Sequence, residues 1–383
     1  MNLLWHSNSP WLTSAYAIQT ALFVPRINKL TGHEVVAISA PYSGSGSALE
    51  WEGVPVLPAV RDVAGCDILP AHYEWFKADA LISLADPFGL LRCAKELAQT
   101  RFFPWFPVDC QPVGIGDVTV LRESGGTPIA MSRFGARMLR DEGADPLFCP
   151  HAVDAEVFSP GDPRPFRDTV PGVTDSTFVV GIVGLNRGRR KAFDQQLLAF
   201  SRFHARHPDS FLALHTAPGG PAPAVNLTGL CTQLGITGCV SFPDSYLFDT
   251  CQISTAQMAS WYRGCDVVSL ASRGEGFGCP LIEAQSCGTP VICADASAMS
   301  ELCGTGWLVS GQPEWEDGHC AWWRNPDASD IEQAYEAAWQ AREDGQMPEL
   351  AESARAFGLR FSIDTIFEQY MKPVLAAIEQ RVS

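Results

Sequence analysis

The chain has 383 residues, of which 46% are hydrophobic and 18% are charged, as in a folded globular protein large enough for two domains. Its 27 basic and 43 acidic residues give a formal net charge of −16 and a pI near 4.9. This acidic balance disfavours binding to a nucleic-acid duplex or to an anionic membrane surface, because like charges repel.

Several further absences narrow the class of protein. No apolar run is long enough for a transmembrane segment, and residues 1–6 lack the charged start of a secretory signal. The thirteen cysteines are scattered and form neither a Cys-x-x-Cys pair nor a zinc pattern. We therefore expect a cytoplasmic protein without a metal, whose cysteines (Cys265, Cys287 and Cys293, for example) are small buried hydrophobes.

The first half of the chain alternates apolar strands with helical stretches. This alternation predicts a doubly wound parallel sheet in an α/β domain over residues 1–158. Strands are expected at residues 3–6, 34–39, 80–84, 128–131 and 146–149, and helices at residues 16–30, 90–99 and 134–143.

Residues 159–175 are rich in Pro, Gly, Asp and Arg and show no periodicity, which is typical of a linker. The alternation then restarts and predicts a second α/β domain over residues 176–362, followed by a terminal helix at 363–383. Strands are expected at residues 178–183, 211–215, 239–242, 265–270 and 289–294, and helices at 193–206, 227–234, 255–263 and 330–343.

The most informative motif is residues 272–283, Ser-Arg-Gly-Glu-Gly-Phe-Gly-Cys-Pro-Leu-Ile-Glu. Pro280 suits the first position of a helix and Gly288 suits its end. Glu283 then lies one turn into the helix, while Glu275 stands on the loop before it. Two carboxylates therefore flank a glycine-rich turn that connects a buried strand to a helix.

The start of this helix has the character of an anion site. The N–H groups of Cys279, Leu281 and Ile282 are expected to be unpaired there, next to the positive end of the helix dipole. An anion pocket with a carboxylate on each side suits a nucleotide sugar. The alternative is an ordinary strand-to-helix turn with solvated glutamates, since short motifs produce many false positives.

A second cluster follows the strand at residues 178–183. Arg187, Arg189, Arg190 and Lys191 place four cations within five residues, at the edge where parallel sheets bind ligands. These cations would neutralise a diphosphate as it leaves. The alternatives are a solvated turn, or a dinucleotide fingerprint, for which the glycines at 181, 184 and 188 have the wrong spacing.

These motifs resemble the retaining glycosyltransferases of family four, whose signature is a pair of glutamates separated by seven residues. Further similarity lies in the Pro-His-Ala-Val-Asp run at 150–154, in Phe-Ser-Pro at 158–160, in Gly184 with Arg190, Lys191 and Asp194, and in Cys-Gly-Thr-Pro-Val at 287–291. The resemblance covers residues 150–309 and is diffuse before them. It implies the GT-B fold, with two Rossmann-like domains whose parallel sheets face a central cleft.

The resemblance also implies roles for individual residues. Glu283 would bind the ribose of the donor nucleotide, Glu275 would lie beside the transferred sugar, and Lys191 with a neighbouring Arg would hold the diphosphate. The catalytic candidates are Glu275, Lys191, Arg187 and Asp109, and the acceptor-side candidates are Trp11, Ser14 and Tyr16. The donor-binding candidates are Glu283, Asn186, Arg190, Gly276, Phe277, Gly278, Cys279, Pro280 and Leu281.

The sequence departs from the family pattern in three places. Leu185 stands where the family has an Arg, so Arg187 or Arg189 would replace it. Alanines at 15 and 17 replace the glycines of the first phosphate loop. The N-domain catalytic His lacks a clear counterpart, and Asp109 and His6 are the candidates for its role; a turn or capping residue is the other reading of Asp109.

The predicted function is transfer of a sugar from a nucleoside-diphosphate sugar to a hydroxyl acceptor, with retention and without a metal or other cofactor. Two alternatives remain open. One is a nucleotide-sugar epimerase of the same fold, and the other is a catalytically inactive sugar-nucleotide-binding protein, which Leu185 and the two alanines favour. An NAD-dependent oxidoreductase is disfavoured because the fingerprint is missing. The base, the sugar and the acceptor are not defined by these motifs.

Overall fold

The computed structural model describes residues 1–31, 36–40, 49–58, 61–220 and 223–382, and the chain divides into two compact units. Each unit is built around a parallel sheet with helices packed on it, the Rossmann-like arrangement that the alternation predicts. Unit 1 consists of Met1–Ala152, Glu316–Ala321 and Ile363–Ser383, and unit 2 of Val153–Trp315 and Trp322–Ser362.

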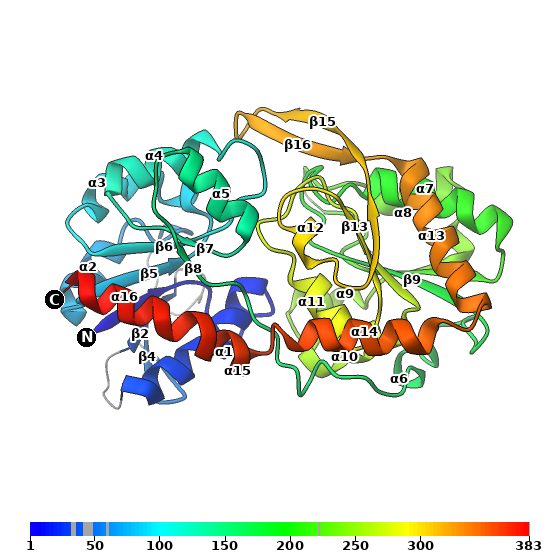
Figure 1. The fold of residues 1–383 in the computed structure, drawn as a ribbon, viewed down its shortest axis with the longest axis horizontal. Coiled ribbons are helices and arrows are strands. Elements are labelled where there is room, and N and C mark those ends of the chain that lie inside the picture. The colour runs from blue at the N-terminus through cyan, green and yellow to red at the C-terminus, as the bar shows by residue number, and fades with distance from the viewer. Residues whose placement is uncertain (32–35, 41–48, 59–60, 221–222, 383) are drawn as a thin grey trace. The chain divides into compact units, whose positions relative to one another are not determined.

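Unit 1 contains a sheet of strand order β3-β4-β2-β1-β5-β6-β7-β8, parallel throughout except between β3 and β4. In Figure 1 this sheet lies between α4 and α5 on one side and α1 and α16 on the other. The strands are β1 (Leu3–His6), β2 (Val36–Ala40), β3 (Leu49–Trp51), β4 (Val54–Pro58), β5 (Ala80–Leu84), β6 (Phe102–Phe106), β7 (Ile129–Ala130) and β8 (Leu147–Phe148).

The helices of unit 1 are α1 (Ala15–Thr31), α2 (Leu69–Phe76), the 3₁₀ segment η1 (Pro87–Cys93), α3 (Ala94–Leu97), α4 (Ile115–Ser124), α5 (Arg133–Asp141), α15 (Ile363–Ile366), the π-helical η3 (Phe367–Met371) and α16 (Lys372–Val382). The terminal run packs on unit 1, where the ring of Tyr370 lies 5.6 Å from that of Phe148, centroid to centroid.

Unit 2 contains a six-stranded, fully parallel sheet of order β11-β10-β9-β12-β13-β14, and β15 pairs with β16 in a separate hairpin. The strands are β9 (Phe178–Val183), β10 (Ser210–His215), β11 (Val240–Ser241), β12 (Val267–Leu270), β13 (Val291–Ala294), β14 (Gly306–Val309), β15 (Gly311–Glu316) and β16 (Ala321–Pro326). The helices are α6 (Arg164–Arg167), α7 (Phe193–Arg206), α8 (Leu227–Gln233), η2 (Thr237–Cys239), α9 (Ser245–Asp249), α10 (Thr255–Gly264), α11 (Cys279–Ser286), α12 (Met299–Leu302), α13 (Ala328–Glu343) and α14 (Met347–Leu359).

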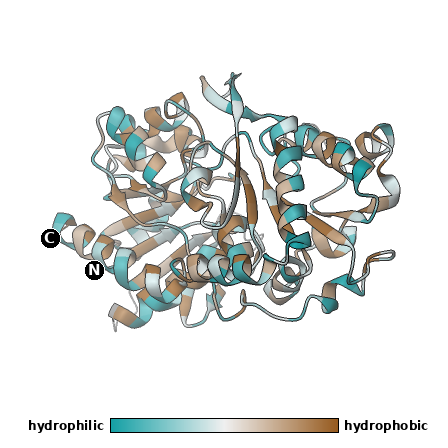
Figure 2. Ribbon diagram, turned by 45° about the vertical axis from the view of Figure 1, so that its right-hand side comes forward, coloured by the Kyte–Doolittle hydropathy of each residue, from teal (hydrophilic) through white to brown (hydrophobic). Residues whose placement is uncertain are grey.

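The cores explain why continuous apolar runs mark these strands. Every residue of β5 and β12 is buried, as parallel sheets covered on both faces require. Figure 2 shows this apolar character on the strands inside each unit. None of the helices in the described part of the chain has both the length and the apolar character needed to cross a membrane.

The sequence prediction missed several elements. The hairpins β3–β4 and β15–β16, the helices α2, α4 and α14, and the strands β6 and β14 were not expected. The expected helix at 90–99 is instead η1 followed by the single turn of α3. Residues 34–35, where the second strand was expected to begin, lie outside the described residues. β6 was missed because it contains Pro104, which nevertheless lies opposite Ser83 of β5.

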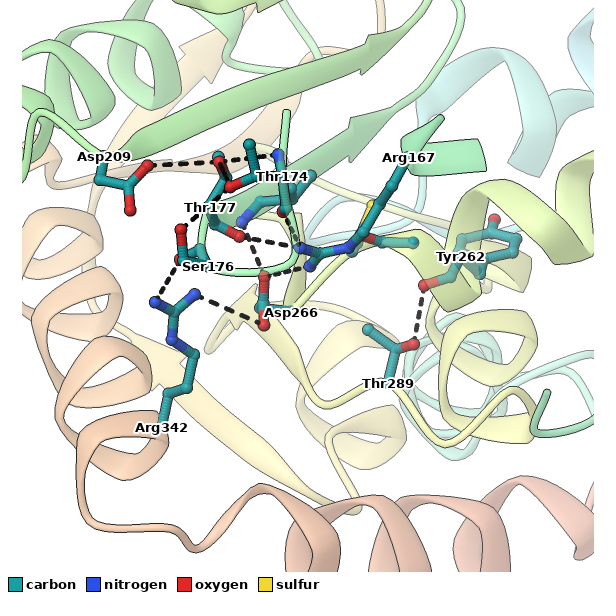
Figure 3. A network of polar contacts seen from close by, with 12 residues as sticks. Arg167, Thr174, Ser176, Thr177, Asp209, Tyr262, Asp266, Thr289 and Arg342 are labelled. Atoms are coloured by element: carbon teal, nitrogen blue, oxygen red, sulfur yellow. Dashed lines mark hydrogen bonds and ion pairs between the residues drawn. The ribbon is translucent and has the colours of Figure 1, made fainter. Parts of the chain in front are cut away.

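The segment expected as a linker is anchored in unit 2 by a buried arginine. Arg167 pairs with Asp266 at 2.7 Å and donates to the carbonyls of Gly264, Thr174 and Thr177 at 2.9–3.0 Å (Figure 3). Asp266 also accepts the N–H of Val179 at 2.8 Å. Arg167 therefore joins this segment to the amino ends of β9 and β12.

We expect Arg167→Met to lower the free energy of unfolding by about 3 kcal/mol, because it removes the closer cation of the largely buried Asp266 and leaves only Arg342, 3.9 Å away. Urea denaturation measures the loss. Arg164→Met is the matched control, since Arg164 forms an exposed ion pair with Asp162 and should cost under about 1 kcal/mol. Equal losses in the two variants would contradict the anchoring role.

Candidate active site

Two loops meet at the carboxyl ends of neighbouring strands in unit 2. We name residues 184–192, after β9, the basic loop, and residues 271–278, after β12, the glutamate loop. Because β9 and β12 are adjacent and parallel, their following loops lie side by side. The N–H of Arg273 donates to the carbonyl of Arg190 at 2.7 Å and joins the two loops directly.

Glu275 is buried between two cations of the basic loop. Its Oε1 lies 2.5 Å from Nζ of Lys191, and its Oε2 lies 2.6 Å from Nη1 of Arg190. Burial alone would raise the pKa of Glu275, but Arg190 and Lys191 lower that pKa to about 2. Glu275 is therefore a carboxylate at neutral pH. The sequence analysis placed Glu275 beside the transferred sugar and Lys191 with a neighbouring Arg at the diphosphate. The structure brings the glutamate and the two cations into direct contact.

Lys191 is positioned by its neighbours. Its stem crosses Gly184 so closely that a Cβ built on Gly184 would lie 3.0 Å from Cδ and Cε of Lys191. Its carbonyl accepts a hydrogen bond from Nε2 of Gln196 at 2.8 Å, and Oε1 of Gln196 accepts from Ser269 at 2.7 Å. Gly184 thus gives the lysine room, and Gln196 ties the lysine backbone to β12.

Glu283 lies on α11 and faces α10. The hydroxyl of Tyr262 donates to Oε2 of Glu283 at 2.7 Å. Burial raises the pKa of Glu283 to about 7, although the hydrogen bond from Tyr262 opposes the rise. Near neutral pH the Glu283 carboxyl group is therefore partly protonated, whereas Glu275 is fully ionised.

The turn before α11 has the predicted form in most respects. Gly278 has φ +115°, a backbone conformation suited to glycine, and α11 begins with Cys279 and Pro280. Gly288, with φ +85°, follows the last turn. One prediction is wrong: the N–H of Leu281 is not left for an anion, because it donates to the carbonyl of Gly278 at 2.9 Å.

The aromatic ring in this turn serves packing. Phe277 is buried, and its ring lies 6.1 Å from that of Phe361, centroid to centroid. The side chain of Phe277 is therefore packed inside unit 2, and contact of its backbone with a ligand stays a prediction. Gly276 is half-buried beside it.

Asn186, predicted to bind the donor, braces the basic loop instead. Its Nδ2 donates to the carbonyls of Ala217 and Val225 at 3.1 and 2.8 Å, and its Oδ1 accepts the N–H of Val225 at 2.9 Å. Both amide hydrogens are used, so the side chain has none to offer to a phosphate. Arg187 and Leu185 are exposed on the same loop.

Sequence reasoning missed Arg273, the buried residue that joins the two loops. Its guanidinium pairs with Asp194 at 3.0 Å and with Glu314 of β15 at 2.9 Å, and it donates to the carbonyl of Arg189. Its exposed fraction is 1%. The available signal was an arginine inside the signature motif. Its role could not be predicted, because its partners lie on α7 and β15, far away in the sequence.

Replacing Arg273 with Met should lower the free energy of unfolding of unit 2 by about 3 kcal/mol, since it removes the buried guanidinium that pairs with Asp194 and Glu314 and donates to the Arg189 carbonyl. Arg273→Lys should not restore it, because one ammonium does not reproduce the guanidinium fork. Urea denaturation measures both. Arg189→Met is the control: Arg189 also pairs with Glu314 but is exposed, so a loss as large as that of Arg273→Met would refute the assignment.

A cavity of about 360 Å³ adjoins the basic loop. It is lined by residues after β10 and β11. One of them, Ala217, accepts a hydrogen bond from Asn186 of the basic loop. Thr216 in its wall is fully buried, and its hydroxyl has no hydrogen-bond partner among the described residues. The lining residues are Thr216, Ala217, Pro218, Gly219, Gly220, Pro243, Ser245, Phe248 and Asp249.

The acceptor-side candidates lie in unit 1, after β1. Trp11 and Ser14 are exposed, and Ser14 accepts the N–H of Ala17 at 3.3 Å at the start of α1. The hydroxyl of Tyr16 donates to Asp86, after β5, at 2.7 Å.

Asp109 is half-buried in the loop after β6. Burial raises the pKa of its neighbour Asp117 to about 7, and the charges of Asp109 and Asp86 add to the rise. His6, the other candidate, is fully buried, and its ring nitrogens lie 2.8 Å from Oγ of Ser83 and 3.0 Å from the carbonyl of Ala64. His6 is therefore a structural residue. Asp109 remains the predicted counterpart of the catalytic His in the first domain of the family.

Similarity to solved structures defines the class of fold. Sucrose-phosphate synthase from Thermosynechococcus elongatus superposes with a TM-score of 0.73 at 16% identity, covering 98% of this chain and 99% of that one. HepE from Anabaena, in complex with UDP-glucose, gives a TM-score of 0.70 at 16% identity, with the same coverage. The chain has the GT-B fold of two Rossmann-like domains.

Sequence similarity links the chain to known glycosyl transferases. The family model for glycosyl transferases group 1 matches residues 177–319, which contain both loops of the candidate site. A D-inositol 3-phosphate glycosyltransferase from Stackebrandtia nassauensis is 29% identical over 265 residues, 65% of this chain and 58% of that enzyme. The chain thus spans less than two thirds of that relative. Over the matched residues it is similar to the group 1 glycosyl transferases.

Proposed function

We propose that this chain transfers a sugar from a nucleoside-diphosphate sugar to a hydroxyl acceptor, with retention of the anomeric configuration. The observation that carries the proposal is the contact of Glu275 with Lys191 and Arg190 at the carboxyl ends of β9 and β12. A carboxylate beside two cations suits a ligand that carries sugar hydroxyls next to a diphosphate. The relatives named as glycosyltransferases and the UDP-glucose in HepE support it.

The parts of the donor can be assigned to the parts of the site. Lys191 and Arg190 hold the diphosphate, and Glu275 accepts hydroxyls of the transferred sugar. Glu283 accepts the ribose hydroxyls, with Tyr262 fixing the orientation of its carboxyl group. The cavity beside the basic loop takes the base, where the buried hydroxyl of Thr216 offers a hydrogen bond.

The proposed mechanism requires no metal. The bond between the anomeric carbon and the β-phosphate oxygen breaks, and Lys191 and Arg190 stabilise the charge that develops on the leaving diphosphate. The acceptor hydroxyl attacks from the same face, and its proton passes to the departing phosphate oxygen. Glu275 stabilises the positive charge that develops on the sugar ring. Asp109 is proposed to orient the acceptor, with Trp11, Ser14 and Tyr16 as its surroundings.

A thermal-shift screen with UDP, GDP and ADP, each with and without a sugar, identifies the donor, because a bound ligand raises the melting temperature by mass action. Incubation of the stabilising donor with candidate hydroxyl acceptors should give a glycoside whose anomeric configuration, read by NMR, equals that of the donor. The product should form equally in EDTA. An epimerised donor, or donor binding without any product, would favour the two alternative functions.

Donor affinity should fall as the pH drops from about 8 to 6. Glu283 has a raised pKa of about 7 in the free protein. Ribose hydroxyls that donate to its carboxylate favour the ionised form and lower this pKa. Binding therefore releases a proton, and affinity is lost as pH falls through 7, by at most about tenfold per pH unit.

Calorimetric titration of the nucleotide sugar across this pH range measures the effect. The nucleotide sugar is the right probe, because a free terminal phosphate titrates at about 6 itself. In Glu283→Gln the affinity should be weaker and flat with pH. A pH slope that persists in this variant would assign the proton to another group.

A further inference from the structure

Two thiols of unit 1 lie against each other outside the candidate active site. Sγ of Cys93, the last residue of η1, lies 2.7 Å from Sγ of Cys66, in the loop before α2. A disulfide bond is about 2.05 Å long, so a small approach would join the two sulphurs. Both cysteines are reduced in this structure.

The segments that carry the thiols are fastened together. Arg92 of η1 forms an ion pair with Asp62 of the loop. Sγ of Cys66 lies 3.5 Å from the carbonyl oxygen of Gly89, and a Cβ built on Gly89 would lie 3.3 Å from Cβ of Ala64. These contacts hold the sulphurs side by side in the folded chain.

The two thiols differ in reactivity. Cys93 is buried, with 2% exposed, whereas Cys66 is half-buried. The hydrogen bond from the Cys93 thiol lowers the pKa of Cys66, against burial and the opposing charges of Asp67 and Glu96. The same bond, together with burial, raises the pKa of Cys93. Cys66 is therefore the more nucleophilic sulphur, and Cys93 is placed to react with it afterwards.

We propose that Cys66 and Cys93 are a peroxide-oxidisable pair that closes to a reversible disulfide in the folded protein. The Cys66 thiolate attacks one peroxide oxygen and the O–O bond breaks. Cys66 becomes a sulfenic acid, and the other oxygen leaves and takes up a proton. Cys93 sulphur then attacks Cys66 sulphur, the S–O bond breaks, and the departing hydroxide takes the Cys93 proton as water. Both sulphurs are oxidised and the peroxide oxygens are reduced; an external dithiol then reduces the disulfide to two thiols and is itself oxidised to a disulfide.

The disulfide would fix the loop that contacts the end of β1. Ala64, two residues before Cys66, is in hydrogen-bond contact with His6 through its carbonyl. Closure therefore cross-links this loop to η1 without any residue of the candidate donor site. Because a cross-link restricts the unfolded chain, the oxidised protein should melt at a higher temperature than the reduced one.

The test treats the reduced 383-residue chain with equimolar hydrogen peroxide, blocks remaining thiols with iodoacetamide, and maps peptides by mass spectrometry without reduction. The expected main product is a 66–93 cross-linked peptide that has lost two hydrogen atoms and that dithiothreitol releases. In Cys93→Ser, Cys66 should instead form a sulfenic acid that dimedone traps. Cys251→Ser, which removes an exposed thiol, should cross-link as the wild type does.

Two results would overturn the proposal. One is oxidation of Cys251 or Cys320 in the wild type while Cys66 and Cys93 stay reduced. The other is conversion of Cys66 to higher acids without the cross-link. Both are read from the wild-type protein, so they do not depend on whether a variant folds.

Discussion

Replacing Glu275 with glutamine is expected to lower kcat about 10²- to 10³-fold, because the variant loses the carboxylate that stabilises positive charge on the sugar in the transition state. Affinity for the nucleoside diphosphate should not fall. In the free protein Glu275 pairs with both Lys191 and Arg190, so its removal leaves both cations available to the diphosphate. Steady-state kinetics and calorimetric titration separate the two effects.

This pair of readouts distinguishes a catalytic Glu275 from a structural one. If Glu275 only held the basic loop in place, nucleotide binding and turnover would fall together. Glu301→Gln is a control that changes a carboxylate on α12 in the same unit and should leave both values unchanged. Wild-type turnover in Glu275→Gln would refute the mechanism.

Lys191→Met is expected to weaken binding of the nucleoside diphosphate about 10- to 100-fold, the range for a hydrogen bond to a charged group. It should lower kcat as well, because the leaving diphosphate loses a cation that stabilises its developing charge. Methionine retains much of the stem that packs over Gly184, so the loss reports on the ammonium. Calorimetry and initial rates measure the two effects.

The matched control is Arg202→Met, on the helix that follows the basic loop. Arg202 is exposed and lies 3.7 Å from Glu332, so removal of its charge should change neither binding nor rate appreciably. Circular dichroism and a thermal melt show whether Lys191→Met is folded. A folded variant with wild-type nucleotide affinity would exclude Lys191 as a diphosphate ligand.

The sequence indicated the loops of the site because both follow buried parallel strands. Buried strands appear as continuous apolar runs, and the carboxyl ends of such strands are where ligands bind. Glu275, Glu283 and Lys191 could be singled out on this basis. The turn at Gly278 followed from local backbone chemistry, which needs no knowledge of distant residues.

What the sequence did not indicate depends on contacts between distant segments. Lys191 and Glu275 are 84 residues apart, and their ion pair follows only from the order of β9 and β12. Arg273 has its partners on α7 and β15, and β15 was itself not predicted. Asn186 was assigned to the ligand because it lies in the basic loop, whereas its amide bonds to residues 217 and 225.

The ion pairs of Glu275 bear on how the proposed reaction cycle would end. When the spent nucleotide departs, Lys191 and Arg190 return to a carboxylate that is already in place. The buried Lys191 and the half-buried Arg190 are therefore never left without an anion, and the electrostatic barrier to product release is lowered. The carboxylate that favours the transfer step would thus also limit inhibition by the product, since it competes with the nucleotide for the same two side chains.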